Sequence, residues 1–277
     1  MRGGTTATRT WKVQGGHAEA RADQVATEEP LEIRLAWDGG ERTVAVTMRT
    51  PGNDEELAAG FLFAEGVIDR RELIAGFRRP IESGDAPEPN VVEVELTEAP
   101  AADLPSLERH FFSSSACGVC GKAGLQALQL RAPGRLPPGP EVDPAVLSGL
   151  PDRLREAQGI FEATGGLHAA GLFDAAGRLI ALREDVGRHN ALDKLFGWAF
   201  LQGLLPLHGR IVLVSGRSSY EILQKCLMAG VPVICAVSAP SSLAVELANR
   251  FGITLVGFLR GDRFNVYSGV ERLPAAV

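Results

Sequence analysis

Two cysteines separated by two residues, Cys117 and Cys120 in the segment SSSACGVCGK, are the sharpest chemical feature of the sequence. A CxxC pair can supply half of a zinc site, act as a redox dithiol, or carry sulfur on a nucleophilic thiolate. A structural zinc site would need a second pair of ligands at finger-like spacing, and none lies nearby. Small polar neighbours, Lys122 and the start of a following helix all favour an accessible thiolate. The motif therefore favours thiol chemistry, with the zinc and redox interpretations left open.

The other two cysteines differ in their surroundings. Cys226 lies on the apolar face of a predicted helix, and Cys235 lies inside the apolar run VPVICAV. Buried cysteines behave as small hydrophobic residues, so we expect both to belong to the core.

A second set of polar residues follows three apolar runs in the C-terminal half, in the loops SGRSSYE, SAPSS and LRGDRF. Ser218 and Glu221 have the spacing of a capping box, which predicts a helix start there. In open α/β sheets ligands collect beyond the carboxyl ends of the strands, where helix N-termini attract phosphate. Arg217, Arg260 and Arg263 would add bidentate donors for phosphate or a guanine edge. These loops predict an anionic, nucleotide-sized ligand, although neither a P-loop nor a GxGxxG fingerprint is present.

A third polar cluster lies in REDVGRHNALDKLFG, directly before an apolar helix. Asn190 could cap this helix, and His189 could be a general base or a hydrogen-bond donor to a ligand. The roles of His189 and Asp185 stay open, because capping and salt bridging explain the cluster equally well. His168, between small residues in TGGLHAAGLF, is expected to be a buried, hydrogen-bonded histidine.

The elements that must position these residues divide the chain into two patterns. Apolar and polar residues alternate in LEIRLAW and in RTVAVTM, and the turn residues DGGE lie between them, which predicts a β-hairpin. A helix is expected to start at Asn53 or Asp54, and the alternating segment VVEVEL predicts another strand. Beyond the stretch APGRLPPGPEVDP, apolar strands alternate with helices, which predicts a mostly parallel sheet covered on both faces. The predicted fold class is thus α/β, with a mixed, mostly parallel sheet and flanking helices, plus a smaller N-terminal α+β part that contains the β-hairpin. The predicted divisions are a flexible tail (1–25), an N-terminal part carrying the CxxC loop (26–132), a Pro/Gly linker (133–144) and a C-terminal α/β domain that binds the ligand (145–277).

Composition limits the possible functions. The net charge of −6 argues against a protein that coats nucleic acid, because such binding relies on many cations. No signal-peptide core and no run of about eighteen apolar residues is present, so we expect a cytoplasmic protein that does not enter the membrane. Four cysteines in a chain of 277 residues do not make a disulfide framework.

Six segments together resemble the FdhD family of formate dehydrogenase accessory proteins over about residues 30–270. They are RTPGNDEELAAGFLFAEG, SSSACGVCGK, TGGLHAAGLF, REDVGRHNALDKLFG, LVSGRSSYEILQKC and GFLRGDRFNVYSG. The resemblance implies a cytidine-deaminase-like fold, a homodimer and sulfurtransferase activity. In such proteins a cysteine desulfurase of the IscS type supplies sulfur, which is held as a persulfide. The acceptor is the molybdenum cofactor, in its bis(molybdopterin guanine dinucleotide) form, that the catalytic subunit of formate dehydrogenase requires.

The resemblance also implies roles for particular residues. Cys117 would carry the persulfide and Cys120 would assist it. The cofactor, bound as a substrate, would contact Phe258, Leu259, Arg260, Gly261, Asp262 and Arg263. No permanently bound metal is expected.

Two other functions compete with this one. A zinc deaminase pairs HxE with PCxxC; His17 and Glu19 form an HAE triplet, but about a hundred residues before CGVC, and no proline precedes Cys117. Alternatively, the protein is a chaperone that holds the cofactor or the apoenzyme without transferring sulfur, and the cysteines are a redox latch.

Overall fold

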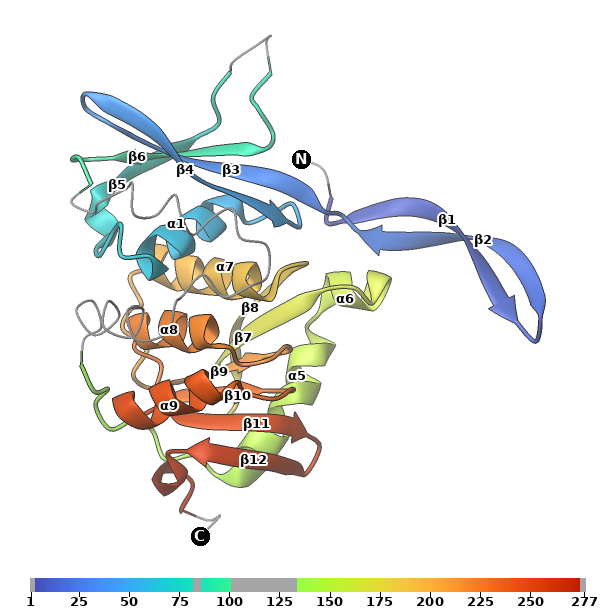
Figure 1. Ribbon diagram of the computed structural model, residues 1–277, viewed down its shortest axis with the longest axis vertical. Helices are drawn as coiled ribbons and strands as arrows, with labels where there is room; N and C mark the ends of the chain where they lie inside the picture. Colours follow the sequence, from blue (N-terminus) through green and yellow to red (C-terminus); the bar gives the residue numbers. More distant parts are fainter. Residues whose placement is uncertain (1–2, 82–85, 101–133, 275–277) are drawn as a thin grey trace.

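The computed structural model describes residues 3–81, 86–100 and 134–274 (Figure 1). Cys117, Cys120 and Lys122 lie outside these residues. The described chain forms a four-stranded sheet, a six-stranded sheet and a separate two-stranded hairpin, with helices between and around the two larger sheets (Figure 1). No helix within the described ranges is both long and apolar enough to cross a membrane.

The four-stranded sheet contains the predicted hairpin and strand. Its order is β4-β3-β6-β5, and its strands are β3 (Glu29–Trp37), β4 (Gly40–Arg49), β5 (Ile74–Arg78) and β6 (Val91–Leu96). β3 and β4 pair antiparallel around the two-residue turn Asp38-Gly39, where Gly39 has φ 86°. Gly39 thus supplies the positive φ at the second turn residue, which glycine adopts without steric cost, whereas the φ of Asp38 is not positive.

The predicted first helix is present as α1 (Asp54–Ala64), but its capping differs from the prediction. Asn53 is the N-cap in the left-handed region, and its side chain makes no capping hydrogen bond. The Asp54 carboxylate instead accepts hydrogen bonds from Arg49 Nε at 3.0 Å and Arg79 Nη2 at 2.8 Å. These guanidinium groups lower the pKa of Asp54 although its burial acts in the opposite direction. The carboxylate therefore ties the helix start to β4.

The six-stranded sheet has the order β12-β11-β10-β9-β7-β8. Its strands are β7 (His168–Asp174), β8 (Leu179–Asp185), β9 (Arg210–Val214), β10 (Val233–Ala236), β11 (Thr254–Arg260) and β12 (Arg263–Ser268). Only β9, β10 and β11 pair in parallel, so the sheet is mixed, as predicted, but it is not mostly parallel. β7–β8 and β11–β12 are joined by short turns, which allow only antiparallel pairing.

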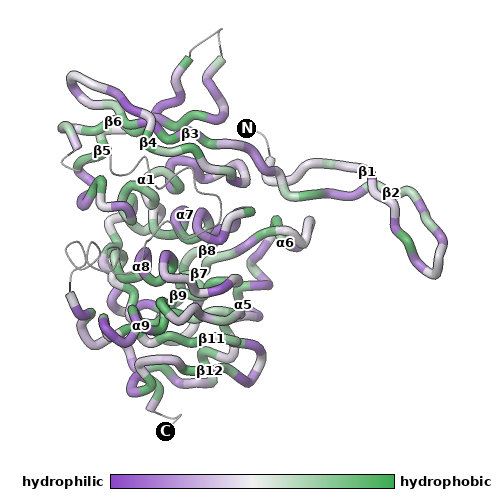
Figure 2. Tube along the Cα trace, in the orientation of Figure 1, coloured by the Kyte–Doolittle hydropathy of each residue, from purple (hydrophilic) through white to green (hydrophobic). Residues whose placement is uncertain are grey.

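Helices cover both faces of this sheet, as the continuous apolar strands predict. Along β9, Ile211 and Leu213 pack in one cluster while Val212 and Val214 pack in the other, since side chains alternate across a strand. The first face is covered by α4 (Pro144–Ser148) and α5 (Leu150–Glu156); the second is covered by α7 (Arg188–Leu201), α8 (Tyr220–Met228) and α9 (Ser242–Phe251). The remaining short helices are η1 (Arg71–Leu73), α6 (Gly159–Thr164) and η2 (Val270–Arg272). Figure 2 shows the hydrophobic residues concentrated along the central strands.

The two larger sheets are joined through a close contact between α1 and α7. A Cβ added to Gly60 would lie 1.9 Å from the Asp193 carbonyl oxygen, and one added to Gly197 would lie 1.8 Å from the Glu56 carbonyl oxygen. Only glycine allows two helix backbones to approach this closely. One hydrophobic cluster consequently extends from β3 through α1 and α7 to the six-stranded sheet.

The stretch 134–143, most of the predicted linker, contains no helix or strand. It is nevertheless attached to the core, because Leu136 and Val142 are buried and their amides donate to the carbonyls of Phe251 and Arg272. The division into domains at this stretch stays a prediction.

The N-terminal segment corrects the prediction of a flexible tail. β1 (Thr5–Gln14) and β2 (His17–Ala26) form an antiparallel hairpin that projects from the body of the molecule (Figure 1). Gly15 and Gly16 both have positive φ, at 59° and 80°, and form its two-residue turn. The sequence signal was the Gly-Gly pair between two segments rich in threonine, valine and alanine.

Candidate anion-binding edge of the six-stranded sheet

The polar residues singled out in the C-terminal half gather along one edge of the six-stranded sheet. The carboxyl ends of β9, β10 and β11 share this edge because these strands are parallel. β7 runs antiparallel to β9, so its first residue, His168, lies there too, beside the last residue of β8, Asp185. Arg217 follows β9 and is exposed. The prediction that several loops meet at one sheet edge is thus confirmed.

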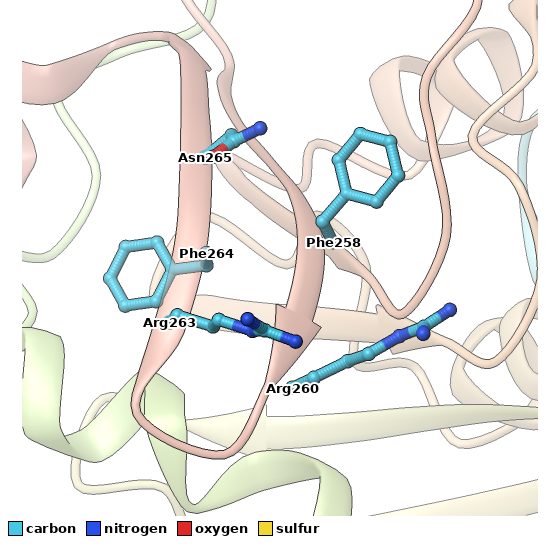
Figure 3. A pocket seen from close by; sticks show the side chains of 5 residues that line it. All are labelled: Phe258, Arg260, Arg263, Phe264 and Asn265. Carbon is cyan, nitrogen blue, oxygen red and sulfur yellow. The ribbon is translucent and has the colours of Figure 1, made fainter.

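A pocket with a cavity volume of about 240 Å³ lies where β11 turns into β12 (Figure 3). It is lined by Phe258, Arg260, Arg263, Phe264 and Asn265. The side chains of Arg260 and Arg263 extend toward the same side of the hairpin, and the ring of Phe264 points to the other side (Figure 3). The volume suits part of a nucleotide rather than a whole dinucleotide cofactor.

The two arginines of this pocket are directly opposite each other across the hairpin. Within the described ranges neither is in an ion pair, and both are exposed. Like charges directly opposite on paired strands repel each other. A phosphate between the two guanidinium groups would remove this repulsion and accept bidentate hydrogen bonds.

The backbone at the end of β11 is irregular, and this irregularity shapes the pocket. Phe258 has φ 54°, a rare conformation for an aromatic residue, and its side chain is 42% exposed. Its amide donates to the Ser238 carbonyl at 3.2 Å, which attaches the end of β11 to the loop after β10. Backbone strain of this kind is common at ligand sites.

The six consecutive residues implied by the family resemblance divide into three groups. Leu259 is fully buried and packs in the core, so its side chain is not available to a ligand. Gly261 and Asp262 form the exposed turn between β11 and β12. The geometry therefore brings Phe258, Arg260 and Arg263 together and leaves Leu259 with a structural role.

The predicted capping box at the start of α8 is wrong. Ser219 is the N-cap residue without a side-chain capping bond, and the buried Ser218 Oγ has no hydrogen-bond partner. Glu221 instead contacts the α7 terminus, with its Oε2 2.8 Å from His189 Nε2. This hydrogen bond lowers the pKa of Glu221, and burial opposes the shift. In SAPSS, by contrast, Ser241 caps α9 by accepting a hydrogen bond from the Ala244 amide.

His168 is half-buried and lies beside β9. Its Nδ1 is 3.4 Å from Ser215 Oγ, which also accepts a hydrogen bond from the Ala169 amide at 2.9 Å. Burial lowers the pKa of His168, and the nearby charges of Arg188 and His189 lower it further. The predicted hydrogen-bonded histidine is confirmed, although it is only half-buried.

Asp185 is fully buried, and its contacts are internal to the protein. It pairs with Lys194 Nζ at 2.7 Å and accepts hydrogen bonds from the amides of Thr50 at 3.1 Å and Gly187 at 2.8 Å. Lys194 Nζ also donates to the Thr50 carbonyl at 2.8 Å. The group fastens the end of β4 to α7, which is a positioning role for Asp185. Thr50 was not singled out from the sequence; it takes part through its backbone and through its Oγ1, which accepts a hydrogen bond from the Val186 amide at 3.1 Å.

Asn190 does not cap α7 as predicted, because the helix starts at Arg188 with Gly187 as N-cap. Its Nδ2 donates to the Met48 carbonyl at 2.8 Å and to Asp185 Oδ1 at 3.2 Å. Asn190 thus belongs to the same attachment between the two parts of the chain.

The described residues contain no group of three or more His, Cys, Asp or Glu side chains placed to hold a metal ion. His17 and Glu19, which could suggest a deaminase signature, are exposed residues of β2 in the projecting hairpin. Cys226 and Cys235 are fully buried, as predicted, and burial strongly raises the pKa of both thiols.

Comparisons with known proteins agree with this architecture. A protein of *Mycolicibacterium paratuberculosis* named sulfur carrier protein FdhD is 48% identical over 274 residues, covering 97% of this chain and 98% of that protein. A protein of *Mycobacterium tuberculosis* with the same name is 51% identical over 265 residues, covering 91% of this chain and 92% of that protein.

A solved structure also matches over nearly the whole chain. It is a crystal structure from *Desulfotalea psychrophila* assigned as a formate dehydrogenase accessory protein, with a TM-score of 0.72 and 26% sequence identity. It covers 97% of this chain and 99% of that chain. The family model described as FdhD/NarQ matches residues 26–274, which include both larger sheets and the pocket. The chain belongs to the FdhD/NarQ family.

Proposed function

We propose that this protein is a sulfur carrier, which takes sulfur from a cysteine desulfurase as a persulfide on Cys117. It then transfers the sulfur to the molybdenum cofactor, in its bis(molybdopterin guanine dinucleotide) form, for formate dehydrogenase. The observation that carries the proposal is the near full-length identity of 48–51% to proteins named sulfur carriers. The CxxC pair supplies a thiol chemistry that fits this name.

The cofactor is a large anionic substrate with two guanosine diphosphate groups. The pocket formed by Phe258, Arg260 and Arg263 supports its binding, because two adjacent guanidinium groups suit a phosphate or a guanine edge and the exposed ring offers a stacking surface. Its volume of about 240 Å³ fits one end of the cofactor. Formate dehydrogenase is proposed as the recipient because the matching solved structure is assigned as its accessory protein.

The proposed sulfur transfer has two balanced steps. In the first, the Cys117 thiolate attacks the outer sulfur of the desulfurase persulfide; that S–S bond breaks, a new one forms on Cys117, and the desulfurase cysteine leaves as a thiolate. In the second, the sulfur leaves Cys117 as sulfide for the metal. Cys120 supplies the electrons by forming a disulfide with Cys117, which a thiol reductant then reopens.

Intact-protein mass spectrometry after incubation with a desulfurase and cysteine tests the first step. The wild type and Cys120→Ala should gain the mass of one sulfur, which reductant removes, and Cys117→Ala should not. No added sulfur in the wild type would favour the second candidate, a chaperone, because the arginine pocket alone would suffice to hold the cofactor.

Binding of GDP, measured by calorimetry, tests the pocket separately. Arg260→Ala and Arg263→Ala should each weaken binding by roughly tenfold or more, since a hydrogen bond to a charged group contributes about 1.5–3 kcal/mol. Arg178→Ala is the matched control, because Arg178 is exposed and belongs to the β7–β8 turn. Equal affinities for all three variants would refute the assignment of the pocket.

A further inference from the structure

A group of basic side chains lies at the same sheet edge as the pocket, but beside other strands. His168 is the first residue of β7, and Arg188 and His189 are the first two residues of α7. A Cβ added to Gly216, in the loop after β9, would lie 3.4 Å from both Arg188 Cδ and His168 Nδ1. Both side chains therefore pack on the same glycine. His168, Arg188 and His189 are here called the basic cluster.

The basic cluster is separate from the pocket at the turn between β11 and β12. The sheet order places β10 and β9 between β11 and β7. Three strand spacings of about 4.8 Å therefore separate β11 from β7, or about 14 Å in all. A single phosphate group cannot span this distance, so the cluster and the pocket would bind different groups.

Arg188 carries a charge that the chain leaves uncompensated. Its Nε is shielded from solvent and has no hydrogen-bond partner, and among the described residues its guanidinium forms no ion pair. A buried polar atom without a partner is uncommon and costs stability. As a whole residue Arg188 is only partly buried, which leaves it open to a ligand from solvent.

Two carboxylates lie near the basic cluster, and each is already bound to another group. Glu221 Oε2 is 2.8 Å from His189 Nε2. Asp185 is fully buried and pairs with Lys194 Nζ at 2.7 Å. Neither carboxylate neutralises Arg188, so the part of the chain that the structure describes supplies no counter-ion for it.

His168 places a second donor beside Arg188. Its side chain lies on the sheet face that α7 covers, because Ala170 and Leu172 of the same strand pack there and side chains alternate. Ser215 Oγ lies 3.4 Å from His168 Nδ1. A hydroxyl that donates to Nδ1 leaves the ring proton on Nε2, which can then donate to a ligand.

The electrostatics of the cluster favour an anion. Burial lowers the pKa of His168, the charges of Arg188 and His189 lower it further, and Asp185 alone acts in the opposite direction. Neighbouring cations thus make a positive charge on this ring unfavourable. An anion between Arg188 and His168 would relieve that repulsion and accept hydrogen bonds from both.

We propose that the basic cluster is a second oxyanion site, which binds a phosphate group. Arg188 offers the planar fork of donors that suits phosphate oxygens. The donors come from two elements, α7 and β7, and a tetrahedral phosphate presents oxygens to both, whereas a flat carboxylate presents only two in one plane. The site does not depend on the sulfur transfer proposed above, and it does not use the arginines of the pocket.

Titration of the full-length protein with inorganic phosphate, followed through the ring signals of His168 by NMR, tests the proposal. Near about pH 7 we expect a saturable shift in roughly the millimolar range, since a partly exposed ionic site is weak. Bound phosphate should raise the pKa of His168, because a negative charge favours the protonated ring. Phosphate held by Arg260 and Arg263 does not affect this readout.

Two variants show whether Arg188 is the residue responsible. Arg188→Gln should weaken phosphate binding at His168 by about tenfold or more, since it removes the permanent charge of the cluster. The matched control, Arg210→Gln, removes an exposed arginine at the other end of β9 and should leave the affinity unchanged. In phosphate-free buffer Arg188→Gln should keep the wild-type Tm, because it loses no ion pair. Added phosphate should raise the Tm of the wild type and of Arg210→Gln more than that of Arg188→Gln.

A parallel titration with GDP identifies the source of the phosphate group. Saturation of the His168 signal by inorganic phosphate at a lower concentration than GDP assigns the site to the free anion, and the reverse order assigns it to a nucleotide phosphate. A His168 signal that responds to neither would overturn the proposal. So would equal phosphate affinities in the wild type and in Arg188→Gln, once thermal unfolding has shown that the variant is folded.

Discussion

The contact between α1 and α7 yields the sharpest stability prediction, at Gly197. A Cβ added at this position would meet three backbone atoms of α1: the Glu56 carbonyl oxygen at 1.8 Å, the Glu56 carbonyl carbon at 2.7 Å and the Gly60 nitrogen at 2.7 Å. Backbone atoms cannot rotate away as a side chain can. Gly197→Ala therefore forces the two helices apart, which disturbs the core shared by both larger sheets.

The magnitude follows from two opposing effects. Overpacking a core costs about 1–3 kcal/mol, and a contact this short belongs at or above the upper end. Alanine in place of glycine within a helix returns about 1 kcal/mol of helix propensity. The net loss is about 2 kcal/mol, which for a chain of this size lowers Tm by roughly 4–8 °C.

Thermal unfolding followed by circular dichroism measures this change, and α6 provides the matched control. Gly159 is a helical glycine whose added Cβ would meet nothing within 4 Å. Gly159→Ala should leave Tm unchanged or raise it slightly, since only the propensity gain applies. If Gly197→Ala is as stable as the wild type, α1 and α7 do not approach each other as closely as described.

Three further predictions concern buried or half-buried groups. His168 should titrate by NMR below its ordinary pKa of 6.5, and Arg188→Gln should raise that pKa by removing a nearby positive charge. The folded chain binds this proton more weakly than the unfolded chain does. The contribution of His168 to stability should therefore fall as the pH drops through about 6.5. A midpoint above 6.5 would contradict this. Lys194→Met should lower the free energy of unfolding, measured with denaturant, by about 3–5 kcal/mol, because Asp185 would stay buried without its counter-charge. A loss below about 1 kcal/mol would show that the pair is not buried. Cys235 should resist iodoacetamide in the native protein and react after denaturation, as peptide mass spectrometry can measure; rapid native labelling would contradict its burial.

Local sequence signals predicted those elements whose structure is determined locally. The Asp38-Gly39 turn between two alternating segments predicts the β3–β4 hairpin because both the turn and the strands act over a few residues. The capping box of Ser218 and Glu221 failed because a distant residue, His189, binds the glutamate instead. A short motif does not include such competition from another part of the chain.

Long-range contacts were beyond the reach of sequence patterns. Gly60 and Gly197 are ordinary glycines in two separate helical segments, and nothing in either segment indicates that they touch. The expectation of mostly parallel pairing failed for a similar reason: the apolar runs indicate buried strands, but their direction is decided by the turns that join them.

The polar residues along the sheet edge differ in whether the protein itself satisfies them. Asp185 and Lys194 have their partners within the chain, so their interactions are complete without a ligand and they hold the two parts together. In the described ranges, Arg260 and Arg263 have no ion-pair partner, and the buried Ser218 Oγ has no hydrogen-bond partner. Facing cations repel each other, so the two exposed arginines are where an anion would gain most, whereas the fully buried Ser218 is not accessible to a ligand. From the sequence, Asp185 and the two arginines all lie in polar loops of the C-terminal half; the structure separates the residue whose interactions are complete within the chain from the arginines, whose interactions are not.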